Sequence, residues 1–315
     1  MRREASPLRI EVLLSETTIA EEFLQALAQR FLPERFFYWF PLSVRAWLRL
    51  CQDGPYRNFI RSDMLVRTGV DEIVRSLPPG PVEVVSLGAG QGTKDLHLLK
   101  ALVGDRRAVS YRPVDAGQTL LEMACANAQE EGIRTTGVKA DIANPTHLES
   151  LRPRRDTPAR LVLLLGNTLG GFDPPAMLRA LRPLLRQGDR LVVDGELHND
   201  LDTRAGYENP FNRAFAFAPL QSIGIRETDG VLVFEPLPDL SPGLHRLGKY
   251  FRAEVDLDLR VAGEAFALKA GERIVMNHSG KYERAAFLNI IADGGFEATA
   301  QWSSEDSRFL MVLAR

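Results

Sequence analysis

Three glycines within five positions, Gly88, Gly90 and Gly92, separate an apolar stretch from a helical pattern. Residues 82–99 read VEVVSLGAGQGTKDLHLL, in which a predicted strand runs into the glycines and an amphipathic helix follows. A glycine turn at this place exposes backbone N–H groups beside the positive end of a helix, where a flat, polar cofactor can lie. The sequence therefore predicts a cofactor site, with Gly88 and Gly90 among its contacts.

Acidic residues follow the next two predicted strands. Asp115 follows the strand over residues 109–114, and Asp141 with Ile142 follows the strand over residues 135–140. The carboxyl ends of parallel strands meet at one edge of a sheet, so both acids are expected beside the glycine turn. Asp115 then suits ribose hydroxyls, and Asp141 with Ile142 suits an adenine. A single Asp after a strand is more often only a turn or cap residue, but the combination favours a cofactor site.

The spacing of the glycines helps to distinguish a nicotinamide dinucleotide from S-adenosylmethionine as the cofactor. A nicotinamide dinucleotide favours G-x-G-x-x-G, whereas this turn reads G-x-G-x-G before Thr93 and Lys94. After the fourth predicted strand, residues 163–172 read LLLGNTLGGF and supply small side chains where a methyl donor and its acceptor must approach closely. We expect Asn167 of this loop to contact the cofactor. The set favours S-adenosylmethionine, and a nicotinamide oxidoreductase is the alternative.

Composition excludes several other classes of protein. The chain has 315 residues, of which 25% are charged, and a formal net charge of -2, so no basic surface for nucleic acid is expected. No apolar run approaches the roughly 20 residues that cross a bilayer. Cys51 and Cys125 lack a C-x-x-C spacing or nearby histidines; we therefore expect no metal site and a cytoplasmic location. The oligomeric state is not predicted.

From residue 62 onward, apolar strand patterns alternate with helical patterns. The predicted strands span residues 82–87, 109–114, 135–140, 159–165 and 190–194, and a last helix over 283–293 leads into strands 296–302 and 309–313. This alternation predicts a doubly wound α/β domain with a parallel sheet, and the last two strands predict a terminal antiparallel hairpin. We expect residues 62–197 and 283–315 to form this domain and to bind the cofactor.

The rest of the chain, residues 1–61 and 198–282, lacks the alternation and is expected to form a smaller α+β domain that binds the substrate or acts as a lid. It contains the densest aromatic cluster, FFYWFP at residues 36–41. Aromatic rings in such a cluster could line a pocket, but a role in the apolar core is the favoured interpretation.

Several motifs together resemble the histidine-specific Nα-methyltransferase family of the ergothioneine pathway, which also includes fungal N-methyltransferases of prenylated tryptophan. The resemblance begins near Tyr56 and continues to the C-terminus. The motifs are LGAGQGTKD (87–95), YRPVDAG (111–117), KADI (139–142), LLLGNTLGGFDP (163–174), AGYENPFNRAF (205–215) and HSGKYER (278–284). The resemblance implies a Rossmann-like class I methyltransferase sheet of seven strands, a separate substrate domain and S-adenosylmethionine as cofactor.

The resemblance also assigns roles by position. Gly88 and Lys94 would contact the methionyl end of the cofactor. Tyr56 and Tyr207 would face the amine and carboxylate of an amino-acid substrate, and Ser279 would face its side chain. Methyl transfer needs an in-line nucleophile with a free lone pair rather than covalent help from the protein. The two tyrosines, which could orient an amine, are therefore the candidate catalytic residues, with core packing as their alternative role.

Two substitutions depart from the family pattern where the substrate would bind. The family loop GSTIGN reads GNTLGG here, so Gly171 replaces an Asn, and the motif E-x-S-x-K begins with Asn277 instead of Glu. A neutral amide supports a charged imidazole less well than a carboxylate does. We therefore expect N-methylation of an amino acid or small amine other than histidine. A histidine at a position such as 278 is more often hydrogen-bonded than catalytic. The alternative function is that of a protein that keeps the cofactor fold but has a binding or regulatory role.

Overall fold

The computed structural model describes residues 7–52, 57–199 and 207–315 and divides into two compact units. Unit 1 comprises residues 1–13, 58–198 and 282–315, and unit 2 comprises residues 14–57 and 199–281. Among the described residues, no helix combines the length and the apolar character needed to cross a membrane.

Unit 1 is built on a mainly parallel sheet, which has nine strands in the described part of the chain. In order across the sheet they are β1 (Ile10–Val12), β6 (Gly137–Lys139), β4 (Val109–Asp115), β3 (Val82–Leu87), β7 (Ala159–Leu164), β8 (Arg190–Glu196), β15 (Phe309–Ala314) and β14 (Ala298–Ser303), with β5 (Arg134–Thr135) paired to β4. Strand β15 is antiparallel to both of its neighbours. The predicted doubly wound α/β sheet with a terminal antiparallel hairpin is confirmed.

The predicted number of seven strands is too small, because β1 and β5 extend the sheet. Strand β1 pairs in parallel with β6, so that Ile10 lies opposite Gly137 and Val12 opposite Lys139. Residues 7–13 therefore belong to unit 1, although the sequence placed residues 1–61 in the smaller domain. A strand of three residues has too little periodicity to reveal a partner more than a hundred residues away.

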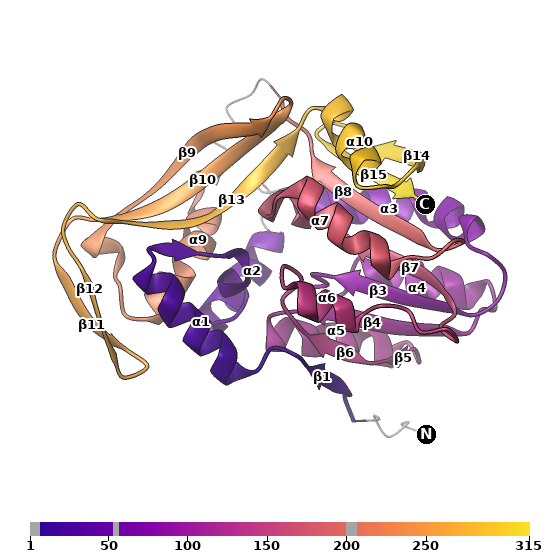
Figure 1. Cartoon of the computed structure of the whole chain (residues 1–315), viewed down its shortest axis with the longest axis horizontal. Helices are drawn as coiled ribbons and strands as arrows, with labels where there is room; N and C mark the ends of the chain where they lie inside the picture. Colours follow the sequence, from indigo (N-terminus) through magenta and orange to yellow (C-terminus); the bar gives the residue numbers. More distant parts are fainter. Residues whose placement is uncertain (1–6, 53–56, 200–206) are drawn as a thin grey trace. The chain divides into compact units, whose positions relative to one another are not determined.

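Helices cover both faces of this sheet (Figure 1). The helices of unit 1 are α3 (Asn58–Ser76), α4 (Asp95–Gly104), α5 (Gln118–Glu130), α6 (Pro145–Ser150), α7 (Pro174–Leu181) and α10 (Arg284–Asp293). Helix α4 packs against α3 and α5, whereas α7 packs against α6 and α10. Every residue of β15 is buried, as expected for a strand covered on both sides. Because the helices cover the two faces of the sheet, polar side chains can lie at the carboxyl ends of its parallel strands.

Unit 2 combines a sheet with helices from both of its chain segments. Its larger sheet has the order β2 (Phe31–Leu32), β13 (Arg273–Tyr282), β10 (Leu244–Ala253) and β9 (Gly230–Ser241), while β11 (Leu257–Val261) pairs with β12 (Glu264–Leu268). The helical segments are α1 (Glu16–Ala28), η1 (Glu34–Phe37), α2 (Pro41–Gln52), α9 (Pro210–Ser222) and η4 (Glu227–Asp229). The last residue of β13, Tyr282, falls in unit 1.

The aromatic segment of residues 36–41 contributes to the core of unit 2. Phe36 and Phe37 are fully buried. The ring of Phe36 lies 5.1 Å from that of Phe23 in an edge-on arrangement, and the ring of Phe37 lies 6.1 Å from that of Phe215 on α9. For these two rings the predicted core role is confirmed.

Candidate active site

The glycine turn after β3 has a backbone that only glycine adopts easily. Gly88, Gly90 and Gly92 all have positive φ, at 67°, 56° and 71°. The backbone N–H groups of Gly88 and Ala89 donate to the carbonyl of Val114, at 2.9 and 3.1 Å, and so tie the turn to β4. The turn is thus held open beside the start of α4 with bare backbone at its tip. The predicted contacts of Gly88 and Gly90 with a cofactor are compatible with this geometry.

The carboxylate of Asp115 joins β4 to the glycine turn. One oxygen accepts a hydrogen bond from the N–H of Gly90 and the other from the N–H of Gly117, each at 2.8 Å. Desolvation raises the pKa of Asp115, and the two amide donors oppose that shift. Each carboxylate oxygen can accept more than one hydrogen bond, so Asp115 can also serve as an acceptor for ribose hydroxyls.

The second strand-end acid lies next to the first. The N–H of Ala140 donates to the carbonyl of Asp115 at 3.0 Å, which aligns the ends of β4 and β6. Asp141 then turns the chain, because its carboxylate accepts the N–H of Ala143 at 2.9 Å. Ile142 is buried beside it. The structure therefore brings Asp115 and Asp141 to neighbouring strand ends, as expected from the parallel arrangement.

A buried carboxylate that the sequence analysis missed, Asp194, organises the loop after β7. It lies near the end of β8 and is fully buried. One oxygen accepts from the N–H groups of Gly166 and Asn167, at 2.6 and 2.8 Å, and the other accepts from the hydroxyl of Ser62. Burial raises the pKa of Asp194, with the charge of Lys94 as the largest opposing effect. Its position at a strand end, like those of Asp115 and Asp141, was the signal available in the sequence.

The loop itself is shaped by Asn167 and by its glycines. Asn167 has a φ of 60°, and its side-chain carbonyl accepts the N–H of Glu196 at 3.0 Å. That oxygen therefore holds the loop to β8. The predicted contact of Asn167 with the cofactor would have to use other atoms of the residue. Gly171 ends the short helix η2 (Thr168–Gly171) and is half-buried.

Lys94 lies between the glycine turn and this loop. It is the N-cap residue of α4, and its ammonium lies 5.3 Å from the ring centroid of Phe59. A Cβ atom on Gly166 would come within 2.6 Å of the Lys94 Nζ, and Gly166 also has a φ of 88°. Glycine at position 166 thus makes room for the lysine, so Lys94 and the β7 loop meet at the strand ends where the cofactor is expected.

Unit 2 brings two predicted substrate residues together with a third residue, Lys281, to which the sequence analysis assigned no role. The hydroxyl groups of Tyr207 and Ser279 are 3.1 Å apart. The ammonium of Lys281 donates to the Tyr207 hydroxyl at 2.5 Å and to the Ser279 hydroxyl at 3.4 Å. Lys281 is only 1% exposed. These three residues, the Tyr207 cluster, form one hydrogen-bonded group, and the spacing S-x-K on one face of β13 was its sequence signal.

Asn277 is two positions before Ser279 on β13 and so has its side chain on the same face. It is 6% exposed, and its side-chain oxygen has no hydrogen-bond partner among the residues that the structure describes. A buried acceptor without a donor is rare, because desolvation is not offset. His278, between them, points to the opposite face of the strand.

Tyr56, the other predicted catalytic residue, lies outside the described residues. No group of three or more His, Cys, Asp or Glu side chains that could hold a metal ion occurs in residues 7–52, 57–199 and 207–315.

Comparison with known proteins identifies the family. A family profile described as "Histidine-specific methyltransferase, SAM-dependent" matches residues 19–315. The chain belongs to this family. It is 26% identical over 259 residues to the N-methyltransferase fsqC of Aspergillus fumigatus, which covers 78% of this chain and 69% of the relative. It is also 30% identical over 115 residues to the 4-dimethylallyltryptophan N-methyltransferase easF of Epichloe festucae var. lolii, covering 35% of this chain and 33% of the relative.

Similar solved structures are also methyltransferases. One is an S-adenosylmethionine-dependent methyltransferase from Clostridium acetobutylicum, 13% identical, with a TM-score of 0.45 and coverage of 82% of this chain and 95% of that one. Another is CalS10, an amino pentose methyltransferase from Micromonospora echinaspora, 13% identical, with a TM-score of 0.42 and coverage of 86% and 95%.

The family membership makes this protein an S-adenosylmethionine-dependent methyltransferase. It also sets aside the nicotinamide oxidoreductase and the non-catalytic protein that the sequence had left as alternatives. The residues present fit this cofactor: Gly88 and Gly90 are only half-buried and carry no side chain, and Asp115 is a fixed acceptor beside them. S-adenosylmethionine is therefore the cofactor.

Proposed function

We propose that this enzyme methylates the amine nitrogen of an amino acid, or of a similar small amine-bearing metabolite, other than histidine. The observation that carries the proposal is the Tyr207 cluster with Asn277 beside it on β13. Two hydroxyl groups and a buried ammonium suit the polar head of an amino acid, while a neutral amide stands where the family has a carboxylate. The names of the related fungal enzymes support an amine as the acceptor.

In this proposal unit 1 binds the cofactor through the carboxyl ends of its parallel strands. Gly88, Gly90 and Lys94 would lie along the methionyl portion, Asp115 would accept hydrogen bonds from the ribose, and Asp141 with Ile142 would face the adenine, with Asn167 as a further contact. When bound, the cofactor supplies a methyl group on a sulfonium, which needs no covalent partner on the protein. The role of unit 1 in this proposal is therefore to hold and orient the cofactor.

The acceptor would be oriented by residues of unit 2. Tyr207, and Tyr56 outside the described residues, would direct the amine and carboxylate, while Ser279 would face the side chain. The ammonium of Lys281 donates to the hydroxyls of both Tyr207 and Ser279. These hydrogen bonds fix the orientation of the two hydroxyl groups. A buried positive charge also favours an acceptor that carries a carboxylate. Lys281 is thus a positioning residue in this proposal.

Selectivity would depend on positions 277 and 171. The side-chain oxygen of Asn277 is buried and can accept one hydrogen bond from a neutral N–H or O–H donor. A charged imidazolium would find no carboxylate there, and Gly171 would offer no side chain. Sites with buried polar groups discriminate strongly against ligands that leave those groups unpaired.

We further propose that the enzyme works in the cytoplasm. Cys125 is a buried thiol without a disulfide bond, as expected for a protein in a reducing compartment.

A thermal-shift screen tests the proposed function. The 315-residue chain is heated with S-adenosylhomocysteine and a panel of amino acids and amines. Compounds that raise the melting temperature are then incubated with the enzyme and S-adenosylmethionine, and their masses are measured by mass spectrometry. We expect ligand-induced stabilisation and a gain of one or more methyl groups on an amine, with histidine among the poor substrates. Efficient methylation of histidine, or methylation on oxygen or carbon only, would contradict the proposal.

A further inference from the structure

The carboxylate of Asp194 is a negative charge in the interior of unit 1. Asp194 has no exposed surface, and a charge in such a place is costly unless hydrogen-bond donors or cations face it. The backbone N–H groups of Gly166 and Asn167 and the hydroxyl of Ser62 all donate to it. Three donors directed at one carboxyl group favour its ionised form. The fold therefore holds a negative charge next to the loop that follows β7.

Lys94 is the cation that acts on this carboxylate. Its charge lowers the pKa of Asp194 against the effect of burial, yet the two groups form no ion pair or hydrogen bond in the described part of the chain. Gly166 is adjacent to both, because its N–H donates to Asp194 and a Cβ atom on it would come within 2.6 Å of the Lys94 Nζ. Lys94 is half-buried, and its ammonium makes no hydrogen bond with any residue that the structure describes. Its donors are therefore left to a ligand.

The topology of the sheet relates these two charges to the cofactor. Strand β3 pairs with β4 on one side and with β7 on the other, and the chain fills the two sides one after the other. In open α/β sheets, ligands bind outside the carboxyl ends of the strands at such a switch point. Asp115 and Asp141, which are proposed to face the ribose and the adenine, follow β4 and β6. The methionyl end of the cofactor is therefore expected toward β7 and β8, where Gly166 meets Lys94.

The charges of the cofactor can be compared with those of this part of the site. The methionyl end of S-adenosylmethionine carries a carboxylate, an ammonium and a sulfonium. The carboxylate is the group that matches the available donors of Lys94. Asp194 then remains as a negative charge on the side of β7 and β8, where the two positive groups are expected. Charges in a protein interior interact over several ångströms without contact, because water screens them poorly there.

We infer that the charge of Asp194 makes this enzyme favour the cationic cofactor over its neutral, demethylated product. Asp194 does not touch the cofactor: it is a positioning residue whose charge acts across the backbone of Gly166 and Asn167. Methyl transfer leaves the electron pair of the broken sulfur–carbon bond on sulfur, so the sulfonium becomes a neutral thioether. The attraction to Asp194 is lost at that point, and S-adenosylhomocysteine is held less tightly and exchanges more readily. The inference concerns the cofactor alone and does not depend on the identity of the acceptor.

The variant Asp194→Asn removes the charge with little change in geometry. The amide oxygen can accept the N–H groups of Gly166 and Asn167, and the amide nitrogen can donate to the hydroxyl of Ser62. Calorimetry measures how tightly the 315-residue chain binds two ligands, S-adenosylhomocysteine and sinefungin. Sinefungin has a protonated amine in place of the methylated sulfonium and transfers no methyl group. We expect the preference for sinefungin over S-adenosylhomocysteine to fall about tenfold or more in the variant, as for a charge that acts at an effective dielectric constant of about 20.

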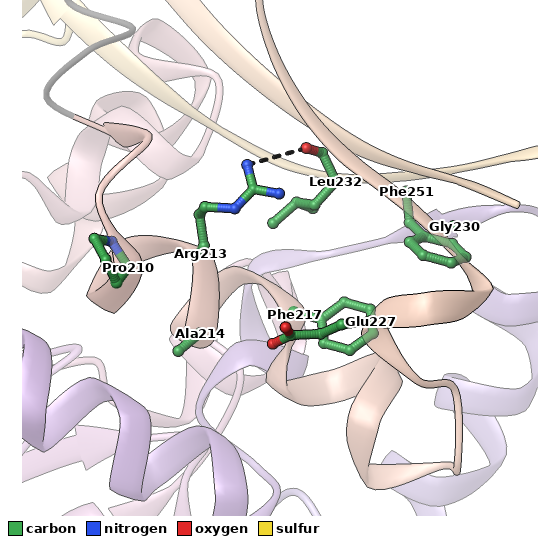
Figure 2. Close-up of a pocket in the computed structure, with 8 residues that line it drawn as sticks. All are labelled: Pro210, Arg213, Ala214, Phe217, Glu227, Gly230, Leu232 and Phe251. Carbon is green, nitrogen blue, oxygen red and sulfur yellow. Dashed lines mark hydrogen bonds between the residues drawn. The ribbon is translucent and has the colours of Figure 1, made fainter. Parts of the chain in front are cut away.

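Two other carboxylates serve as controls. Asp189 is buried and directly precedes β8, at the end of the strand opposite to Asp194, and it accepts the backbone N–H groups of Arg160 and Arg186 at 2.8 and 2.7 Å. Glu227 is an exposed carboxylate of unit 2, at a cavity of about 400 Å³ between α9, η4, β9 and β10 (Figure 2). Asp189→Asn and Glu227→Gln each remove one negative charge away from the carboxyl ends of the parallel strands. Neither should change the preference between the two ligands.

Two results would overturn the inference: an unchanged preference in Asp194→Asn, or an equal loss of affinity for both ligands, which would mean that the carboxylate only holds the loop. The wild type provides a test that does not require the variant to fold. It should bind sinefungin at least as tightly as S-adenosylhomocysteine, and clearly tighter binding of S-adenosylhomocysteine would contradict the inference. These titrations contain no acceptor, so their outcome is separate from that of the screen for the proposed function.

Discussion

The ammonium of Lys281 lies 2.5 Å from the hydroxyl oxygen of Tyr207 and 4.5 Å from the centroid of the same tyrosine ring. The two residues are 74 positions apart in the sequence. Lys281 is almost completely buried, so this contact occurs where water screens charge poorly and hydrogen bonds to charged groups are strong. The orientation of the Tyr207 hydroxyl is therefore tied to the lysine.

Replacing Lys281 by Met should impair the acceptor side of the reaction only. Loss of a charged hydrogen-bond donor commonly costs about 1.5–3 kcal/mol, so we expect kcat/KM for the acceptor to fall about 10- to 100-fold. Affinity for S-adenosylhomocysteine, measured by calorimetry, should stay unchanged. Lys281→Arg should restore part of the activity, and the exposed Lys269→Met serves as control. A parallel loss of cofactor affinity would mean that Lys281 only supports the fold.

Replacing Asp115 by Ala should abolish stabilisation by S-adenosylhomocysteine. The substitution removes the expected ribose acceptor and also frees the N–H groups of Gly90 and Gly117. At a ligand concentration 100 times the Kd, the wild type should gain about 2.7 kcal/mol, and the variant should gain almost nothing. The matched control is Asp173→Ala, which removes an exposed carboxylate that caps α7. An undiminished melting shift in Asp115→Ala would exclude the ribose role.

Replacing Asn277 by Glu should move the substrate preference toward histidine. A carboxylate at this position can pair with an imidazolium, whereas the present amide cannot. We expect the ratio of kcat/KM for histidine to that for the best native acceptor to rise by about tenfold or more. Competition assays with both substrates measure this ratio directly. Asn277→Gln, which lengthens the side chain without adding charge, is the control, and an equal effect of both variants would argue against charge-based selectivity.

A half-buried pair in unit 2, Lys249 and Glu34, should make stability depend on pH. The Lys249 ammonium lies 4.5 Å from the ring centroid of Phe37, and desolvation lowers its pKa to about 8, against the attraction of Glu34. Burial raises the pKa of Glu34. Because the folded lysine loses its proton at lower pH than the unfolded one, unfolding takes up a proton between pH 8 and about 10.5. Stability contributed by this residue therefore rises across that interval.

The variant Lys249→Met with Glu34→Gln should lack this dependence. Relative to the variant, the wild type should gain about 2 kcal/mol in free energy of unfolding between pH 8 and 10. Urea unfolding can be followed by the fluorescence of Trp39 and Trp47, which lie in unit 2. The exposed Lys269→Met controls for general loss of positive charge. Parallel pH profiles of wild type and double variant would show that the pair does not titrate in this range.

The glycine turn and the strand-end positions of Asp115 and Asp141 were predictable from the sequence because their signals are local. The turn from Gly88 to Gly92 needs positive φ, which few other residues tolerate, and an acid after a strand stays at the strand end whatever the rest of the chain does. Asp115 and Asp141 are therefore found where parallel strands place them. The alternation of strand and helix patterns likewise predicted the doubly wound sheet and its terminal hairpin.

Other features depended on contacts between distant segments. Strand β1 is too short to reveal its pairing with β6, and nothing near Asp194 in the sequence indicates that it accepts hydrogen bonds from the loop at Asn167. The same is true of Lys281, whose neighbours suggest surface charge, although the fold buries it against Tyr207. Residue type and local backbone preference thus determined the kind of cofactor. Burial and hydrogen-bond partners arise only when remote segments pack together, and they decided which polar groups lie together in the Tyr207 cluster.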